Sequence, residues 1–200
     1  MWNTRRVEEP RKEALVSGAR AFLRYPCLED QEEYLTLVRA SRDFHRPWEP
    51  IPAQGVPAVD SPESFQLMIF GSANPRVERM FLCRSEDGAV LGRFCFNEIV
   101  RGAFESAYLS YWMGAPFARR GYGLEGIELA LQHAFEGMGL HRVEANIQPH
   151  NEPSLALARG AGVLQEGFSK RYQQIAGEWA DHERWAITIE DWRERRDNAP

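Results

Sequence analysis

The sequence of 200 residues has no apolar run long enough to cross a membrane, and its beginning lacks the apolar stretch of a signal peptide. It has only three cysteines, none in a Cys-x-x-Cys pair, and an odd count argues against a disulfide framework. It also lacks the positive excess of a nucleic-acid binder, because its formal net charge is −5. We therefore expect a reduced, cytoplasmic protein with no nucleic-acid or membrane partner.

Several catalytic and metal-binding patterns are missing as well. There is no Gly-x-Ser-x-Gly elbow of the serine hydrolases and no His-Glu-x-x-His zinc motif. His141, His150 and His182 lack metal-ligand spacing, so we expect no metal. What remains is an ordinary mixture, 44% hydrophobic and 26% charged, that can bury the core of one domain.

Periodicity and turn residues predict an α+β fold. The expected strands cover residues 14–26, 78–84, 89–100, 105–114 and 141–147, with a closing hairpin around Gly177; the expected helices cover 28–45, 61–74, 124–138 and 151–162. Asp30 and Asn151 are placed to cap helices. Five prolines from Pro47 to Pro62 predict a long loop. We expect one domain over residues 15–192, between a flexible N-terminal arm (1–14) and a polar, solvated tail (193–200).

The stretch ARRGYGLEG contains a Gly-x-Gly-x-x-Gly at Gly121, Gly123 and Gly126, which allows two interpretations. A dinucleotide-binding unit has such glycines, but its strand runs directly into the first one, whereas residues 116–120 intervene here. The alternative is a nest of backbone amides at the start of a helix. Such a nest binds the diphosphate of coenzyme A, and Arg119 and Arg120 add positive charge.

Longer motifs favour the second interpretation. They are NEIVRGAFESAYLSYWMG, HRVEANIQPHNEPSLALARGAG, EGFSKRYQQIAGEWADHERWAI and the loop FHRPWEP. Through them, most of the chain resembles the GNAT superfamily of acyl-CoA N-acyltransferases, and within it the RimJ/RimL-type N-terminal acetyltransferases of ribosomal proteins. The superfamily's Gln/Arg-x-x-Gly-x-Gly/Ala signature falls on residues 118–123, where Ala118 departs from it. The resemblance implies a central mixed, mostly antiparallel sheet, splayed at its middle and flanked by helices.

The resemblance also implies where acetyl-CoA, the co-substrate, would bind. The expected cofactor-binding residues are Tyr111, Trp112, Met113, Arg119, Arg120, Gly121, Tyr122, Gly123, Leu124, Asn151 and Ser154. Backbone groups of residues 111–113 would face the pantetheine and the acetyl carbonyl, while the rings of Tyr111 and Trp112 pack. Many superfamily members use a tyrosine to protonate the leaving thiolate, but Ala158 stands at that position. RimL-like relatives use a serine, which here is Ser154.

The general base is harder to assign. Relatives have a glutamate at one of two positions, which are occupied here by Asn146 and Gln173. We keep Asn146, through a bound water, and Glu144, which shares its side of the strand, as catalytic candidates beside Ser154. Further candidates are the side chains of Glu105, Asp181 and His182.

Without a strong base, an α-amine is the easier acceptor. With a pKa near 7.7–8.0, about one α-amine in eight is neutral at pH 7, against about one lysine in 2,500. We therefore expect direct acetyl transfer in a ternary complex to a protein or peptide N-terminus, by resemblance that of a ribosomal protein. The alternatives are a small amine (amino acid, polyamine or drug) as acceptor, or a non-catalytic CoA sensor. A monomer or homodimer is expected.

Overall fold

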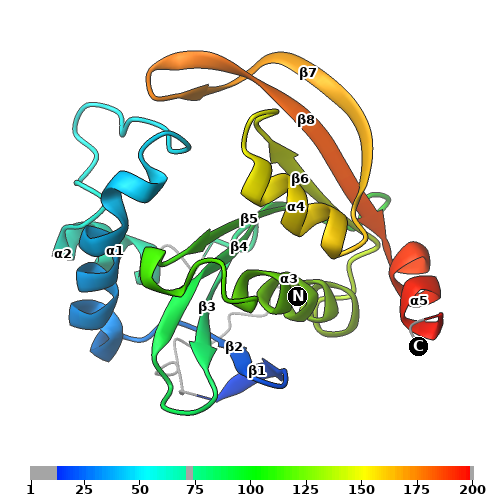
Figure 1. Ribbon diagram of the computed structural model, residues 1–200, viewed down its shortest axis with the longest axis horizontal. Coiled ribbons are helices and arrows are strands. Elements are labelled where there is room, and N and C mark those ends of the chain that lie inside the picture. The colour runs from blue at the N-terminus through cyan, green and yellow to red at the C-terminus, as the bar shows by residue number, and fades with distance from the viewer. Residues whose placement is uncertain (1–12, 71–73, 199–200) are drawn as a thin grey trace.

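The computed structural model describes residues 13–70 and 74–198, and its centre is an eight-stranded sheet (Figure 1). The strand order is β1-β2-β3-β4-β5-β6-β8-β7, antiparallel throughout except for β5 and β6. The strands are β1 (Ala14–Ser17), β2 (Ala21–Arg24), β3 (Glu78–Arg84), β4 (Val90–Val100), β5 (Ser106–Met113), β6 (Arg142–Ile147), β7 (Leu164–Ile175) and β8 (Glu178–Thr188). The helices are α1 (Gln31–His45), α2 (Pro62–Phe70), α3 (Tyr122–Gln132), α4 (Glu152–Gly160) and α5 (Ile189–Asp197), with shorter turns at η1 (Leu28–Asp30), η3 (Ala115–Phe117) and η4 (His133–Gly137).

Alternation along the strands divides the core between the two faces of the sheet. On β5, Leu109 and Met113 belong to the larger core, which includes α3 and α4, and Tyr111 packs against it. Trp112 points the other way and joins Tyr34 of α1 and Phe65 of α2 in a second core. Because successive strand residues face opposite sides, one strand serves both cores.

The sheet opens at its middle, as the resemblance implied. The parallel pairing of β5 with β6 covers only Ser106 to Tyr108 against Arg142 to Glu144. Beyond those residues β5 continues to Met113 and β6 to Ile147, each without the other as a partner. The exposed strand edges therefore leave backbone groups available to a ligand. The predicted α+β, splayed fold is confirmed.

The N-terminal region corrects two expectations. Residues 14–26, predicted as one strand, form a hairpin of β1 and β2, because Gly18 N donates to Ala21 O at 2.8 Å and turns the chain. Asp30 does not cap α1 with its side chain. Its carboxylate instead accepts from the buried Arg24 guanidinium, with two bonds of 2.7 Å, and from Cys27 N at 2.8 Å.

The chain ends need a third correction. Residues 193–197, assigned to a solvated tail, complete helix α5, and Arg195 pairs with Glu128 and donates to Gly160 O at 3.3 Å. Residues 199–200 of the expected tail and 1–12 of the expected arm lie outside the described residues, and β1 already begins at Ala14.

Candidate active site

The glycine loop forms an uncapped helix start. Gly121 is the N-cap of α3 with φ +85°, Arg119 has φ +59°, and no side chain caps the helix. The first helical bond of α3 runs from Glu125 N to Gly121 O, so the preceding amides have no acceptor in the helix. Free amides at the positive end of an eleven-residue helix form an anion site.

Two other glycines of the motif serve packing rather than the anion. A Cβ on Gly126 would lie 2.4 Å from the Phe94 ring, so this glycine lets α3 approach the sheet. A Cβ on Gly123 would lie 3.2 Å from Leu157, and Leu124 lies equally close to the Cβ position of Gly160. The glycines thus bring the start of α3 against the C-terminal half of α4. The mostly antiparallel sheet and the η3 turn before Gly121 contradict the dinucleotide alternative.

An arginine from a distant segment joins this loop and was missed in the sequence. Arg20, in the β1–β2 turn, lies over the Tyr122 ring at 4.8 Å and donates to Arg120 O at 3.1 Å. It also pairs with Glu125 at 3.2 Å. The side chains of Arg119 and Arg120 are exposed, as a diphosphate contact requires. Arg20 lies 100 residues before Arg120 in the sequence, so no local motif around the glycines could have predicted this contact.

Backbone groups of β5 face the opening. Gly114 N donates to Leu91 O of β4 at 2.8 Å, so even-numbered residues of this segment point their backbone groups at β4. Those of Tyr111 and Met113 therefore point at the gap, as expected. The Met113 carbonyl already accepts from His45 Nε2 at 2.7 Å. The side chains of Trp112 and Met113 are buried, so of these two residues only Met113 presents backbone groups to the gap. The expectation that the Trp112 backbone faces the ligand is wrong, because its backbone groups point at β4.

The serine proposed as proton donor has a tyrosine partner. Asn151 caps α4 by accepting from Ser154 N at 3.3 Å, which places the Ser154 hydroxyl 2.6 Å from the Tyr111 hydroxyl. Burial raises the pKa of Tyr111 to about 12, although the bond to Ser154 opposes this. The phenol is therefore protonated at neutral pH and can donate to Ser154. The expectation that the Tyr111 ring only packs missed this hydroxyl.

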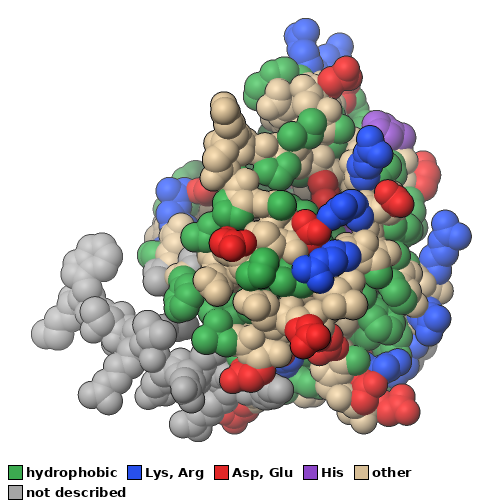
Figure 2. All heavy atoms as spheres, turned by 90° about the vertical axis from the view of Figure 1, so that its left-hand side faces the viewer, with side chains coloured by type: hydrophobic (Ala, Val, Ile, Leu, Met, Phe, Trp, Pro, Cys, Tyr) green, Lys and Arg blue, Asp and Glu red, His purple; other side chains and the backbone are tan. Residues whose placement is uncertain are grey.

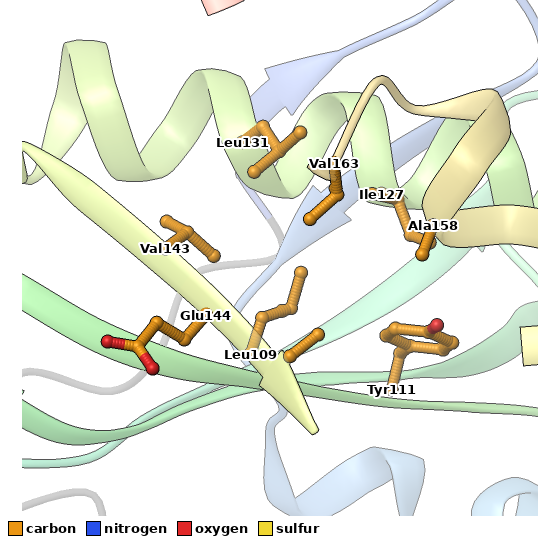
Figure 3. A pocket seen from close by; sticks show the side chains of 9 residues that line it. Leu109, Tyr111, Ile127, Leu131, Val143, Glu144, Ala158 and Val163 are labelled. Carbon is orange, nitrogen blue, oxygen red and sulfur yellow. The ribbon is translucent and has the colours of Figure 1, made fainter. Parts of the chain in front are cut away.

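The apex of the gap is apolar. A cavity of about 10 Å³ lies between β5, β6 and the two helices. It is lined by Leu109, Tyr111, Ile127, Leu131, Val143, Glu144, Ala145, Ala158 and Val163 (Figure 3). The Glu144 carboxylate points away from the other side chains. This cavity has room for one water at most and its accessible surface is apolar, so we expect the inner end of the opening to exclude solvent.

A family comparison agrees with this architecture. Residues 20–163 match the model of the acetyltransferase (GNAT) domain. The chain belongs to the GNAT family. It is 29% identical to the [ribosomal protein uS5]-alanine N-acetyltransferase of Escherichia coli K12 over 154 residues, 76% of this chain and 79% of the relative.

Solved structures agree as well. Mycobacterium smegmatis RimJ in complex with CoA-disulfide is 29% identical, with a TM-score of 0.77, over 86% of this chain and 83% of that one. Vibrio cholerae spermidine N-acetyltransferase in complex with CoA and spermine has a TM-score of 0.73 over 88% of this chain and 99% of that one. Since it is 18% identical, that likeness shows the fold alone. This GNAT protein is an N-acetyltransferase, and acetyl-CoA is its co-substrate.

The structure places the GNAT protein's candidate bases in very different surroundings. Glu144 is held by two guanidinium groups, Arg142 at 3.1 Å and Arg184 at 2.8 Å, which weighs against it as a base. Glu105 lies before β5, at the end where the sheet is closed, and is held by Arg101 at 3.0 Å. Asp181 accepts from Arg171 N at 2.7 Å. These three carboxylates therefore have structural partners.

Asn146 belongs to a polar cluster on the face opposite α3 and α4. Its Nδ2 donates to the Tyr172 hydroxyl at 3.2 Å, and its buried Oδ1 has no partner. The Tyr172 ring lies 5.5 Å from that of His182, whose pKa is lowered by burial. An orphaned amide oxygen beside the gap fits the expectation that Asn146 orients a water. Gln173 pairs with Ala180 across the β7–β8 hairpin.

Residues 13–70 and 74–198 contain no group of three or more His, Cys, Asp or Glu side chains that could hold a metal ion. No helix among them has the length and apolar character needed to cross a membrane.

Proposed function

We propose that this enzyme acetylates the N-terminal α-amine of a protein, foremost a ribosomal protein. The observation that carries the proposal is the similarity to the uS5-alanine acetyltransferase, which spans more than three quarters of both chains. The similarity to RimJ at the same identity supports it. Glu144 is paired with arginine and Asn146 has an amide, so neither residue offers a free carboxylate as a base. This suits an α-amine, which is already partly neutral at pH 7.

The site residues take complementary roles in this proposal. The amides at the start of α3, with Arg20, Arg119 and Arg120, hold the diphosphate. Backbone groups of Tyr111 and Met113 face the pantetheine and the acetyl carbonyl, and Asn151 holds the arm near α4. Acetyl-CoA supplies an activated thioester, which the amine attacks directly in the ternary complex.

Ser154 gives its hydroxyl proton to the departing sulfur. Tyr111 stabilises the serine oxygen through their 2.6 Å bond, and solvent replaces the proton. The start of α4 stabilises negative charge nearby. Asn146, through its free Oδ1, holds a water that accepts a proton from the attacking nitrogen.

The test is the release of free thiol from acetyl-CoA with a panel of amines. We expect release with peptides that begin with alanine or serine and none with their N-blocked forms. Release only with free amino acids, polyamines or drugs would select the small-amine alternative. Tight CoA binding without release by any amine would select the sensor.

A further inference from the structure

The loop between α1 and α2 crosses the acceptor side of the opening. The Trp48 ring lies 5.5 Å from that of His150, which follows β6. Its neighbour Glu49 accepts a hydrogen bond through its backbone oxygen from Ala176 N, 3.1 Å away in the β7–β8 turn. In Figure 1 this loop lies beside the tip of the β7–β8 hairpin. The loop thus joins the two arms of the sheet across their gap.

Glu49 also faces a cavity on the β5 side of the gap. It lines a cavity of about 70 Å³ under α1 and α2, together with Tyr34, Val38, Val59, Ser64, Phe65, Met68, Arg93 and Trp112. Trp112 is a residue of β5 beyond the last pairing with β6, so the cavity adjoins the gap. The face of α1, α2 and the loop mixes hydrophobic, acidic and basic side chains (Figure 2). A cavity of this size holds a few waters or a small side chain.

The carboxylate of Glu49 differs from the earlier base candidates. Within the described part of the chain, no donor or cation pairs with its side-chain oxygens, whereas Glu144, Glu105 and Asp181 all have partners. Glu49 is half-buried. A half-buried carboxylate without a protein partner is free to accept a proton.

The charged and titratable groups around Glu49 come from several elements. Arg93 of β4 lines the same cavity and donates to the Tyr34 hydroxyl at 2.9 Å. His45 of α1 donates from Nε2 to the Met113 carbonyl. Burial lowers the pKa of His45, so its ring is neutral at pH 7. His150 reaches the loop through Trp48. Glu49 carries the one carboxyl group among the residues that line this cavity.

The geometry points to Glu49 as the catalytic residue that accepts the proton of the acceptor ammonium, directly or through one water. This inference rests on the proposed function, since it takes an amine acceptor at the opening. One proton passes from the ammonium nitrogen to a Glu49 oxygen, and the neutral nitrogen attacks the thioester carbon. The C–N bond forms and the C–S bond breaks, the second proton of the nitrogen passes to the water held by Asn146, and the departing sulfur takes the proton of Ser154. Glu49 then returns its proton to solvent.

The test compares Glu49→Gln, Glu49→Asp and the matched control Glu178→Gln, which changes an exposed carboxylate at the β7–β8 tip. With an alanine-started peptide at pH 7, we expect Glu49→Gln to lower kcat about 100-fold, within the range of general-base effects. Glu49→Asp should recover part of the loss, and the control should match the wild type. Acetyl-CoA affinity, measured by calorimetry, should stay the same in all four proteins.

The pH profile separates a base from a binding residue. Above the pKa of the amine, solvent has already removed the proton, so the Glu49→Gln deficit should shrink to a few-fold at pH 9. The base role would be overturned if Glu49→Gln changed only KM, or if its kcat deficit were equal at pH 7 and pH 9. It would also be overturned if Glu49→Gln had the same kcat as the wild type. If the wild type uses only spermidine, the proposed function fails while the same comparison, run on spermidine, still decides Glu49. If no amine is acetylated, both proposals fail.

Discussion

The two sides of the opening are built in contrasting ways. The proposed cofactor side consists mainly of backbone amides and side chains from two nearby segments, residues 111–124 and 151–154, and Arg20 is its one distant member. The proposed acceptor side gathers single side chains from distant elements: Glu49 from the loop, Arg93 from β4, Trp112 from β5 and Asn146 from β6. Binding of the co-substrate thus depends mostly on local motifs in this proposal, whereas acceptor choice depends on the whole fold.

Changing Ser154 on the cofactor side should give the largest effect. We expect Ser154→Ala to lower kcat about 100-fold, or about 2.7 kcal/mol, because the leaving thiolate loses its proton donor. Acetyl-CoA affinity should change little, since Asn151 caps α4 through the Ser154 backbone. Stopped-flow thiol release and calorimetry check the two parts.

Two further variants sharpen that result. Tyr111→Phe removes the hydroxyl that bonds the Ser154 hydroxyl at 2.6 Å and the Ser154 backbone oxygen at 3.2 Å, and it should cost less than the serine change. Ser110→Ala, which removes an exposed hydroxyl bonded to Asn97, is the matched control. Wild-type turnover in Ser154→Ala would show that the proton comes from elsewhere.

Changing the diphosphate loop should impair binding instead of turnover. A β-branched residue is strongly disfavoured at φ +85°, so Gly121→Val should move the amides and weaken acetyl-CoA binding about tenfold, or about 1.4 kcal/mol. Gly102→Val introduces the same strain at φ +81° in the β4–β5 turn, where a Cβ meets nothing within 4 Å. Equal loss of affinity in both variants would mean that strain, not the loop, is responsible.

Trp48→Ala should act on the acceptor side alone. Losing the contact with His150 frees the loop from the β6 arm, so KM for the peptide should rise several-fold while the KM for acetyl-CoA stays constant. Phe104→Ala, at an aromatic side chain that is 72% exposed in the β4–β5 turn, is the control. A rise in the KM for acetyl-CoA would break the proposed division between the two sides.

The same contrast explains what the sequence could predict. The helix starts at Gly121 and Asn151 lie in short motifs, so local pattern predicted them. The role of Ser154 came from the family resemblance and stays a prediction. Arg20 and Glu49 reach the site through a hairpin turn and a proline-rich loop, whose paths depend on contacts made after folding. Periodicity likewise predicted the strands of the meander.

The partners of individual side chains were the other feature that the sequence could not predict. Asp30 stands where a cap is expected, yet a buried arginine from the preceding strand takes its carboxylate. Glu144 stands in the expected catalytic strand, yet guanidinium groups from β6 and β8 engage it. A propensity rule describes one segment at a time, so competition from another segment lies beyond it.

The pH response of His45 should be the smallest effect and tests how the acceptor side is held to the strand edge. Burial lowers its pKa in the folded protein, so the unfolded chain binds its proton more readily. The stabilisation is complete above about pH 6.5, the ordinary histidine value, and is lost as the pH falls below it. We expect the urea midpoint to fall less between pH 7.5 and 5.5 in His45→Gln than in the wild type, with His182 contributing equally to both proteins. An identical fall would mean that burying the His45 ring beside the β5 edge does not disfavour its protonation, and that other groups set the acid limit of stability.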